Sequence, residues 1–170
     1  MERGDDVRFW EATAVSRYGP EEHRDARDRT CVDIGGTRSL RLRHRADPRE
    51  LTHIRASISD WAEDIGVPAD VLVDLQLAVG EAAANSIEHA YRGRAPGLLE
   101  IDLEVRPRGS TNPHPVIAAR VADHGRWRPA PVATGYRGRG LALIHQLAEN
   151  VVISATGVGT QACFEIALAG

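Results

Sequence analysis

Glu81-Ala-Ala-Ala-Asn85-Ser-Ile-Glu-His89-Ala-Tyr91 ends a segment whose apolar residues recur at helical spacing from Pro68 to about Tyr91. At about 100° per residue, Glu81, Asn85 and His89 fall on one stripe of the predicted helix. The stripe borders an apolar arc formed by Val71, Leu75, Val79, Ala82, Ser86 and Ala90. Such a stripe is most often the solvated edge of a surface helix. Here the three alanines between Glu81 and Asn85 also let another group approach the helix closely.

Strands and helices are predicted on both sides of this helix. Leu40 and Leu42 alternate with polar residues, which predicts a strand over 38–43. Asp47-Pro48 is typical of a helix N-terminus, with Pro48 at the first helical position and the helix ending at Gly66. Further strands are expected at 98–105, 116–121, 151–155 and 162–168, and a short helix at 140–149.

This order of elements predicts the fold class. One strand precedes two helices, and the strands that follow are joined mainly by hairpins. We therefore expect an α+β fold, a two-layer sandwich in which a mixed, mostly antiparallel sheet carries helices on one face. A doubly wound α/β fold is the alternative, and it is disfavoured because strands and helices do not alternate regularly.

Composition excludes several classes of protein. A chain of 170 residues, 42% hydrophobic, is expected to form one compact domain. Two cysteines are too few for a disulfide framework, and no apolar run is long enough for a membrane span or a signal peptide. We therefore expect a soluble, cytoplasmic protein without a membrane partner. All 21 Lys and Arg residues are Arg, which excludes chemistry that needs a lysine.

Charge divides the chain into two parts. The formal net charge is −3, and the whole excess falls within residues 1–36, whereas residues 37–170 are neutral. Gly19-Pro20 and Gly35-Gly36 interrupt the first part, which is predicted to be an N-terminal extension or linker. Residues 37–170 are expected to form the functional domain. Their interleaved charges give no footprint for nucleic acid.

Two glycine-containing motifs have the chemistry of a ligand site. Asp123-His-Gly125 places a carboxylate at the end of a predicted strand, where it can accept a hydrogen bond from a ligand amino group. Gly138-Arg139-Gly140-Leu141 stands at the start of a predicted helix, where backbone N–H groups favour phosphate, and Arg137 adds positive charge. Each motif alone is weak, and Asp123-His-Gly125 is equally a plain turn.

Taken together, these motifs resemble a known family. Glu81-x-x-x-Asn85, Asp123-x-Gly125, Gly138-x-Gly140 and Gly159-Thr160 resemble, in order and spacing, the N, G1, G2 and closing Gly-Thr boxes of the Bergerat-fold (GHKL) histidine-kinase-like ATPases. Within that superfamily, the string from Asn85 to Tyr91 resembles the anti-sigma-factor serine/threonine kinases. The resemblance extends from about Arg38 to Leu168.

The resemblance implies roles for single residues. Asn85 would hold Mg²⁺ that bridges the phosphates of ATP, and Glu81 would act as the base or orient the attacking hydroxyl. Asp123 would bind the adenine amino group, with Gly125 and Thr160 shaping the purine pocket.

The resemblance also implies a phosphate-binding segment. Gly138, Gly140 and Leu141 would wrap the phosphates at the helix start, and Arg137 or Arg139 would reach the γ-phosphate. His89 would be a further pocket residue; the alternative is a histidine packed at the helix edge.

The leading hypothesis is a kinase that phosphorylates an anti-anti-sigma (STAS) protein and, by resemblance, binds a sigma factor and forms a homodimer. Two departures favour an alternative, a weak or inactive regulator that acts by protein binding. Trp127 replaces the second glycine of the first glycine box, and the segment that follows is short and contains Pro129 and Pro131. A histidine kinase is disfavoured, because no long apolar helix pair flanks His23.

Overall fold

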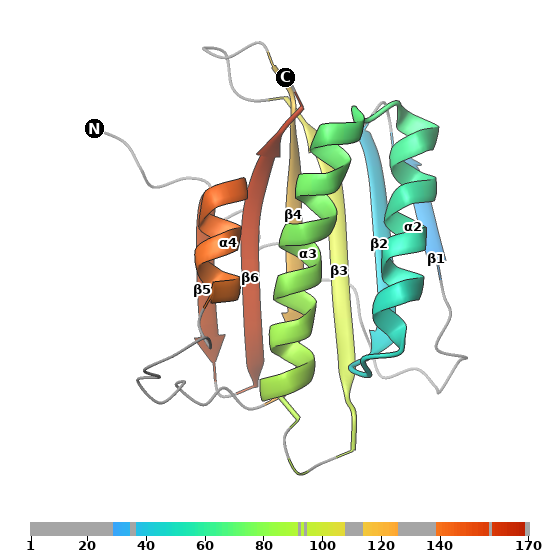
Figure 1. Ribbon diagram of the computed structural model, residues 1–170. Coiled ribbons are helices and arrows are strands. Elements are labelled where there is room, and N and C mark those ends of the chain that lie inside the picture. The colour runs from blue at the N-terminus through green and yellow to red at the C-terminus, as the bar shows by residue number, and fades with distance from the viewer. Residues whose placement is uncertain are drawn as a thin grey trace.

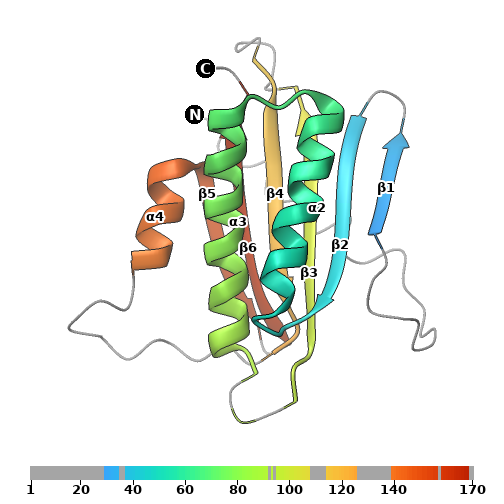
Figure 2. The same cartoon turned by 45° about the vertical axis from the view of Figure 1, so that its right-hand side comes forward.

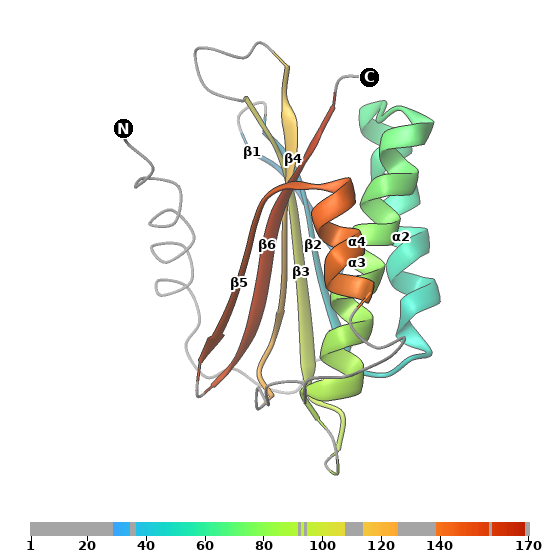
Figure 3. The same ribbon diagram turned by 60° about the vertical axis from the view of Figure 1, so that its left-hand side comes forward.

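The computed structural model describes residues 29–34, 37–91, 93, 95–107, 114–125, 139–156 and 158–168. These residues form two layers, with a sheet on one side and helices on the other (Figure 1). Seen from the side, the described helices all cover one face of the sheet (Figure 3). The predicted α+β two-layer sandwich is confirmed. No described helix combines the length and the apolar character needed to cross a membrane.

The sheet contains six strands in the order β1-β2-β3-β4-β6-β5. All pairings between the described strands are antiparallel, where a partly mixed sheet was expected. The strands are β1 (Arg29–Ile34), β2 (Thr37–Arg45), β3 (Leu98–Arg106), β4 (Val116–Asp123), β5 (Glu149–Thr156) and β6 (Gly159–Ala167).

Strand β1 lies inside the segment that was predicted to be an extension. Its residues pair with β2 in a hairpin in which Ile34 stands opposite Thr37. Gly35 and Gly36, which suggested a boundary between extension and domain, fall between these two paired residues. Among the described residues, the sheet therefore begins at Arg29.

Three helices pack on the sheet in the described part of the chain: α2 (Glu50–Ile65), α3 (Ala69–His89) and α4 (Arg139–Leu147). Gly66 ends α2 with φ +74°, a left-handed conformation that favours glycine, and Pro68 immediately precedes α3. Helix α2 starts later than predicted. Asp47 and Pro48 form a turn in which the Asp47 carboxylate accepts the Arg49 N–H at 2.9 Å.

Helix α3 lies between α2 and α4 and is the centre of the helical layer (Figure 2). Its apolar arc is buried against the sheet, as the helical spacing predicts, and Leu75 and Val79 are fully inaccessible. On the sheet side, alternate residues of β3 face the helices, so that Leu99, Ile101 and Leu103 complete the core. Glu81 and Asn85 of the polar stripe thereby lie on the side of α3 that meets α4.

Candidate functional site

Two of the residues predicted to bind a ligand, Asp123 and Thr160, lie at one end of the sandwich, where the strand ends are at the bottom of Figure 1. There β4 ends, β3 and β6 begin, and α3 reaches its C-terminus. A cross-strand row joins Leu99 of β3, Asp123 of β4 and Thr160 of β6. The sheet register therefore places Asp123 and Thr160 next to each other, although they are far apart in the sequence.

Asp123 is held by backbone donors on both sides. The residue is almost entirely buried, 4% exposed, and its Oδ1 accepts the N–H of Gly125 at 3.0 Å and that of Thr160 at 3.3 Å. Within the described residues, Oδ2 forms no hydrogen bond. One oxygen thus fixes the carboxylate, and the other is available as an acceptor for an amino group.

Two glycines allow the backbone to close tightly around Asp123. A Cβ on Gly125 would lie 2.5 Å from the Cβ of Ala90 and would also overlap the Ala90 carbonyl oxygen. Gly159 has φ +153°, and a Cβ there would overlap the carbonyl oxygen of Asp123. A side chain at either position would push the strand ends apart, so both glycines are required by close approach.

Glu81 and Asn85 lie one turn apart on α3 and face the start of α4. A Cβ on Gly140 would lie 2.5 Å from Oε2 of Glu81 and 3.4 Å from Nδ2 of Asn85. Helices α3 and α4 are in contact. The structure therefore brings together three of the predicted residues, from the N box and the second glycine box.

The polar groups of this cluster suit a hydrated cation and phosphate. Asn85 Nδ2 is buried and has no hydrogen-bond partner among the described residues, an arrangement that costs about 1–3 kcal/mol when nothing satisfies the amide. Since Nδ2 donates no hydrogen bond that would fix the amide, the side chain can turn to present its oxygen. Carboxylate and amide oxygens are the ligands that Mg²⁺ prefers. The residues present thus fit the implied metal.

The remaining predicted residues are either substantially exposed or fall outside the described residues. His89 is not packed as the alternative supposed: its side chain is 43% exposed and lies 3.9 Å from Glu88. Leu141 is 38% exposed in the first turn of α4. Trp127, Pro129, Pro131, Arg137 and Gly138 lie outside the described residues, as does the side chain of Arg139.

Sequence reasoning missed the hydrogen bonds made by Tyr91 and His124. The Tyr91 hydroxyl donates to the Leu98 carbonyl at 2.8 Å and accepts the His124 N–H at 2.9 Å. Burial, more than any other factor, raises the Tyr91 pKa. Tyr91 ends the quoted helical string, so its place beside the site was visible in the sequence. The hydrogen-bond partners of its hydroxyl depend on the sheet register, so the sequence did not show them.

His124 also connects the site to a charged network on the outer face of the sheet. Its Nε2 lies 3.4 Å from Oε2 of Glu100, and this contact raises the His124 pKa while it lowers the Glu100 pKa, against the effect of burial in both cases. Arg43 lies 3.3 Å from Glu100, and Arg120 lies 2.9 Å from Asp102. This face is opposite to the helices, because Glu100 and Asp102 alternate with the buried residues of β3.

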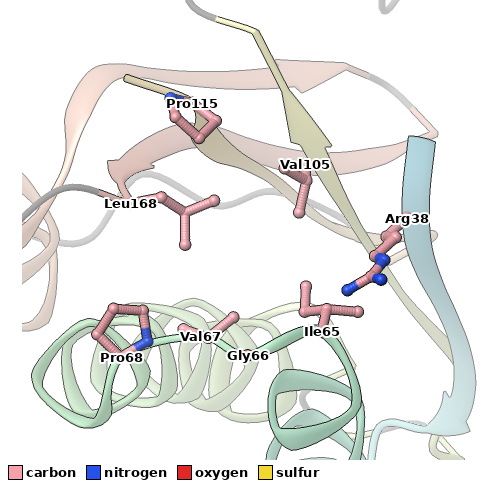
Figure 4. Close-up of a pocket in the computed structure, with 8 residues that line it drawn as sticks. All are labelled: Arg38, Ile65, Gly66, Val67, Pro68, Val105, Pro115 and Leu168. Carbon is pink, nitrogen blue, oxygen red and sulfur yellow. The ribbon is translucent and has the colours of Figure 1, made fainter. Parts of the chain in front are cut away.

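A cavity of about 340 Å³ lies at the opposite end of the sandwich (Figure 4). Its lining is apolar apart from Arg38: Arg38, Ile65, Gly66, Val67, Pro68, Val105, Pro115 and Leu168. It contains none of the predicted site residues and offers no carboxylate or amide side chain. We therefore assign the candidate site to the strand end that holds Asp123 and to the α3–α4 contact that holds Glu81 and Asn85.

Two curated proteins that this chain resembles are both named serine-protein kinase RsbW. The chain is 29% identical over 80 residues to the serine-protein kinase RsbW of Listeria innocua, which covers 47% of this chain and 46% of that protein. It is 35% identical over 60 residues to the serine-protein kinase RsbW of Bacillus subtilis, which covers 35% of this chain and 38% of that protein. The chain thus spans less than half the length of these curated relatives.

Structure and family comparisons agree on the fold. A solved structure of the RsbU and RsbW domains of a Mycobacterium tuberculosis protein matches 75% of this chain and 32% of that chain, with a TM-score of 0.55 and 23% identity. Residues 44–166 match the family described as histidine kinase-like ATPase domain, a range that includes Glu81, Asn85, Asp123, Gly140 and Thr160. The chain therefore belongs to the histidine kinase-like ATPase domain family.

Proposed function

We propose that this chain is an anti-sigma-factor-type serine/threonine kinase that binds ATP with Mg²⁺ and phosphorylates an anti-anti-sigma protein of the STAS class. One observation carries the proposal: Glu81 and Asn85, one turn apart on α3, lie together against the backbone of Gly140. The family membership and the curated relatives named serine-protein kinase support it.

ATP is assigned to the site as substrate, with its base at the strand ends. Oδ2 of Asp123 accepts a hydrogen bond from the adenine amino group, while Gly125 and Thr160 shape the pocket around the purine. This assignment is supported by the two backbone donors that occupy Oδ1 and so leave a single acceptor for the base. His89, at the end of α3, borders the same pocket.

The phosphates are assigned to the junction of α3 and α4. Gly138, Gly140 and Leu141 approach them through the backbone, and Arg137 or Arg139 neutralises charge on the γ-phosphate. Asn85 holds the metal through its amide oxygen. When bound, Mg²⁺ neutralises the negative charge that the phosphates bring into the site.

Glu81 is assigned the catalytic role. The hydroxyl oxygen of the acceptor serine or threonine attacks the γ-phosphorus, the bond from that phosphorus to the β–γ bridging oxygen breaks, and ADP leaves. The Glu81 carboxylate orients the hydroxyl and accepts its proton. Glu81 suits this role because it forms no ion pair with a described residue that would occupy its oxygens.

The wider role follows from the same resemblance. We propose that the chain acts in the cytoplasm, binds a sigma factor when its STAS partner is unavailable and so regulates transcription, and forms a homodimer. Residues 29–168 supply the ATP-binding body, and the acidic segment before β1 is assigned to an extension.

Transfer of labelled γ-phosphate from ATP to a purified STAS protein tests the function. We expect transfer by the wild type, strong loss in Glu81→Ala and Glu81→Gln with ATP binding retained, and no loss in Glu88→Gln. Glu88 is a matched control because it lies on the same helix with its side chain 69% exposed. Transfer that survives Glu81→Ala would remove the assigned role of Glu81. A wild type that binds ATP and transfers to no STAS protein would favour a regulator that acts by binding alone.

A further inference from the structure

A single tyrosine hydroxyl joins the ends of β3 and β4 beside Asp123. Tyr91 lies just beyond the C-terminus of α3, and its hydroxyl donates to the carbonyl of Leu98, the first residue of β3. The same oxygen accepts the N–H of His124, the residue that follows Asp123. The two distances, 2.8 Å and 2.9 Å, are those of good hydrogen bonds.

The Tyr91 hydroxyl takes the place of the direct hydrogen bonding that the next residue pair of the sheet would form. Leu99 pairs with Asp123 in the antiparallel register, so Leu98 and His124 would be the next opposite pair. Both bond to the Tyr91 oxygen instead. The position of the peptide group between Asp123 and His124 therefore depends on Tyr91.

The two residues that follow α3 contact this end of the sheet at two further points. A side chain at Gly97 would overlap the Tyr91 ring, with its Cβ 2.7 Å from the hydroxyl oxygen, so the ring is seated directly on the backbone that leads into β3. The preceding residue, Ala90, is in backbone contact with Gly125. The two residues after α3 thus enclose Asp123 and the turn that follows it.

We infer that Tyr91 is a positioning residue for base recognition: through the His124 peptide it sets the direction in which Asp123 presents its free oxygen. This inference rests on the proposed binding of ATP at Asp123. Tyr91 acts through the backbone, since its hydroxyl is occupied by Leu98 and His124. Its loss is therefore expected to reduce discrimination at the base more than affinity for the rest of the nucleotide.

The test compares ATP with inosine triphosphate, which carries a carbonyl where ATP carries the amino group. Dissociation constants for both are measured by calorimetry in the presence of Mg²⁺ for the wild type and for Tyr91→Phe. We expect Tyr91→Phe to weaken ATP binding by about three- to tenfold, the usual effect of one hydrogen bond, and to leave inosine triphosphate binding nearly unchanged. A merely structural role would weaken both nucleotides alike.

Ser57→Ala is the matched control, because it also removes a buried hydroxyl that donates to a carbonyl, that of His53 at 2.8 Å, away from the site. It should leave the ATP preference intact. Gly97→Ala is a second variant, which keeps the hydroxyl but displaces the ring and should lower the preference as Tyr91→Phe does. If both Tyr91→Phe and Gly97→Ala keep the wild-type preference for ATP over inosine triphosphate, the inference about Tyr91 is overturned and the proposed ATP site stands. A wild type that binds neither nucleotide overturns the proposed ATP site as well.

Discussion

Gly140, in the first turn of α4, lies against the Glu81 carboxylate on α3, so that a Cβ at Gly140 would be 2.5 Å from Oε2. The contact joins a helix start to the polar stripe of another helix, and it leaves no room for a side chain. Because the carboxylate is the flexible end of Glu81, an added methyl would displace Glu81 rather than separate the helices. The position of Glu81 can therefore be changed without unfolding the protein.

Gly140→Ala is expected to lower phosphate transfer far more than stability. A shift of about 1 Å in a reacting group costs about 100-fold in rate, whereas the free energy of unfolding should change by less than about 1 kcal/mol. The transfer rate and chemical denaturation are measured on the same preparation. Gly80→Ala is the control: Gly80 is within α3, and a Cβ there would be 3.8 Å from Arg55, so this change should stabilise the helix by about 0.5–1 kcal/mol and leave transfer unchanged. Wild-type transfer by Gly140→Ala would show that Glu81 needs no fixed position.

Asp123→Asn is expected to weaken ATP binding by about 10- to 100-fold, because it removes a charged acceptor. The amide oxygen can still accept the N–H groups of Gly125 and Thr160, which turns the amide NH₂ toward the amino group of the base. Two donors then face each other. Calorimetry with ATP and Mg²⁺ measures the loss, and Asp70→Asn, in the exposed first turn of α3, should bind like the wild type. Unchanged affinity in Asp123→Asn would place the base elsewhere.

The helix and the strand end that carry the site could be predicted because their signals are local. Glu81 and Asn85 lie on a helix of many turns, and Asp123 follows an apolar strand. Strand β1 was missed because Arg29 to Ile34 follows a highly charged run, which masked the alternation of Thr30, Val32 and Ile34.

Contacts between distant segments could not be predicted in the same way. The Tyr91 hydroxyl meets the His124 N–H, 33 residues away, because the β3–β4 register and the end of α3 coincide in space. The contact of Gly140 with Glu81 likewise depends on how α4 packs beside α3. Helical spacing shows which face of α3 is polar, and only tertiary packing determines which group meets it.

Leu75→Ala should lower the free energy of unfolding by about 2–5 kcal/mol, because Leu75 is fully inaccessible between α3 and the sheet and its loss leaves a cavity. Leu77→Ala is the matched control on the same helix, where the side chain is 43% exposed, and should cost less than about 1 kcal/mol. Urea denaturation of both variants measures the difference. Equal costs for the two would contradict the packing of α3 on the sheet.

The His124–Glu100 pair should make stability depend on pH. The Glu100 hydrogen bond raises the His124 pKa above its ordinary value of 6.5, so the contribution of His124 is fully present below pH 6.5 and is lost as the pH rises through the raised pKa. The same contact lowers the Glu100 pKa from 4.5, so the contribution of Glu100 is present above pH 4.5 and is lost as the pH falls through the lowered pKa.

The His124–Glu100 pair therefore stabilises the fold most between pH 4.5 and pH 6.5. The gain should stay below about 1 kcal/mol, because the His124 side chain is 55% exposed and solvent screens the contact. Denaturation at several pH values is compared for the wild type, Glu100→Gln and the exposed control His145→Gln. Glu100→Gln should remove the fall in stability above pH 6.5 and return the His124 pKa, followed by NMR, toward 6.5, whereas His145→Gln should change neither. A His124 pKa that stays raised in Glu100→Gln would mean that another group holds the proton on the imidazole, and Asp123, whose charge also raises this pKa, is the candidate.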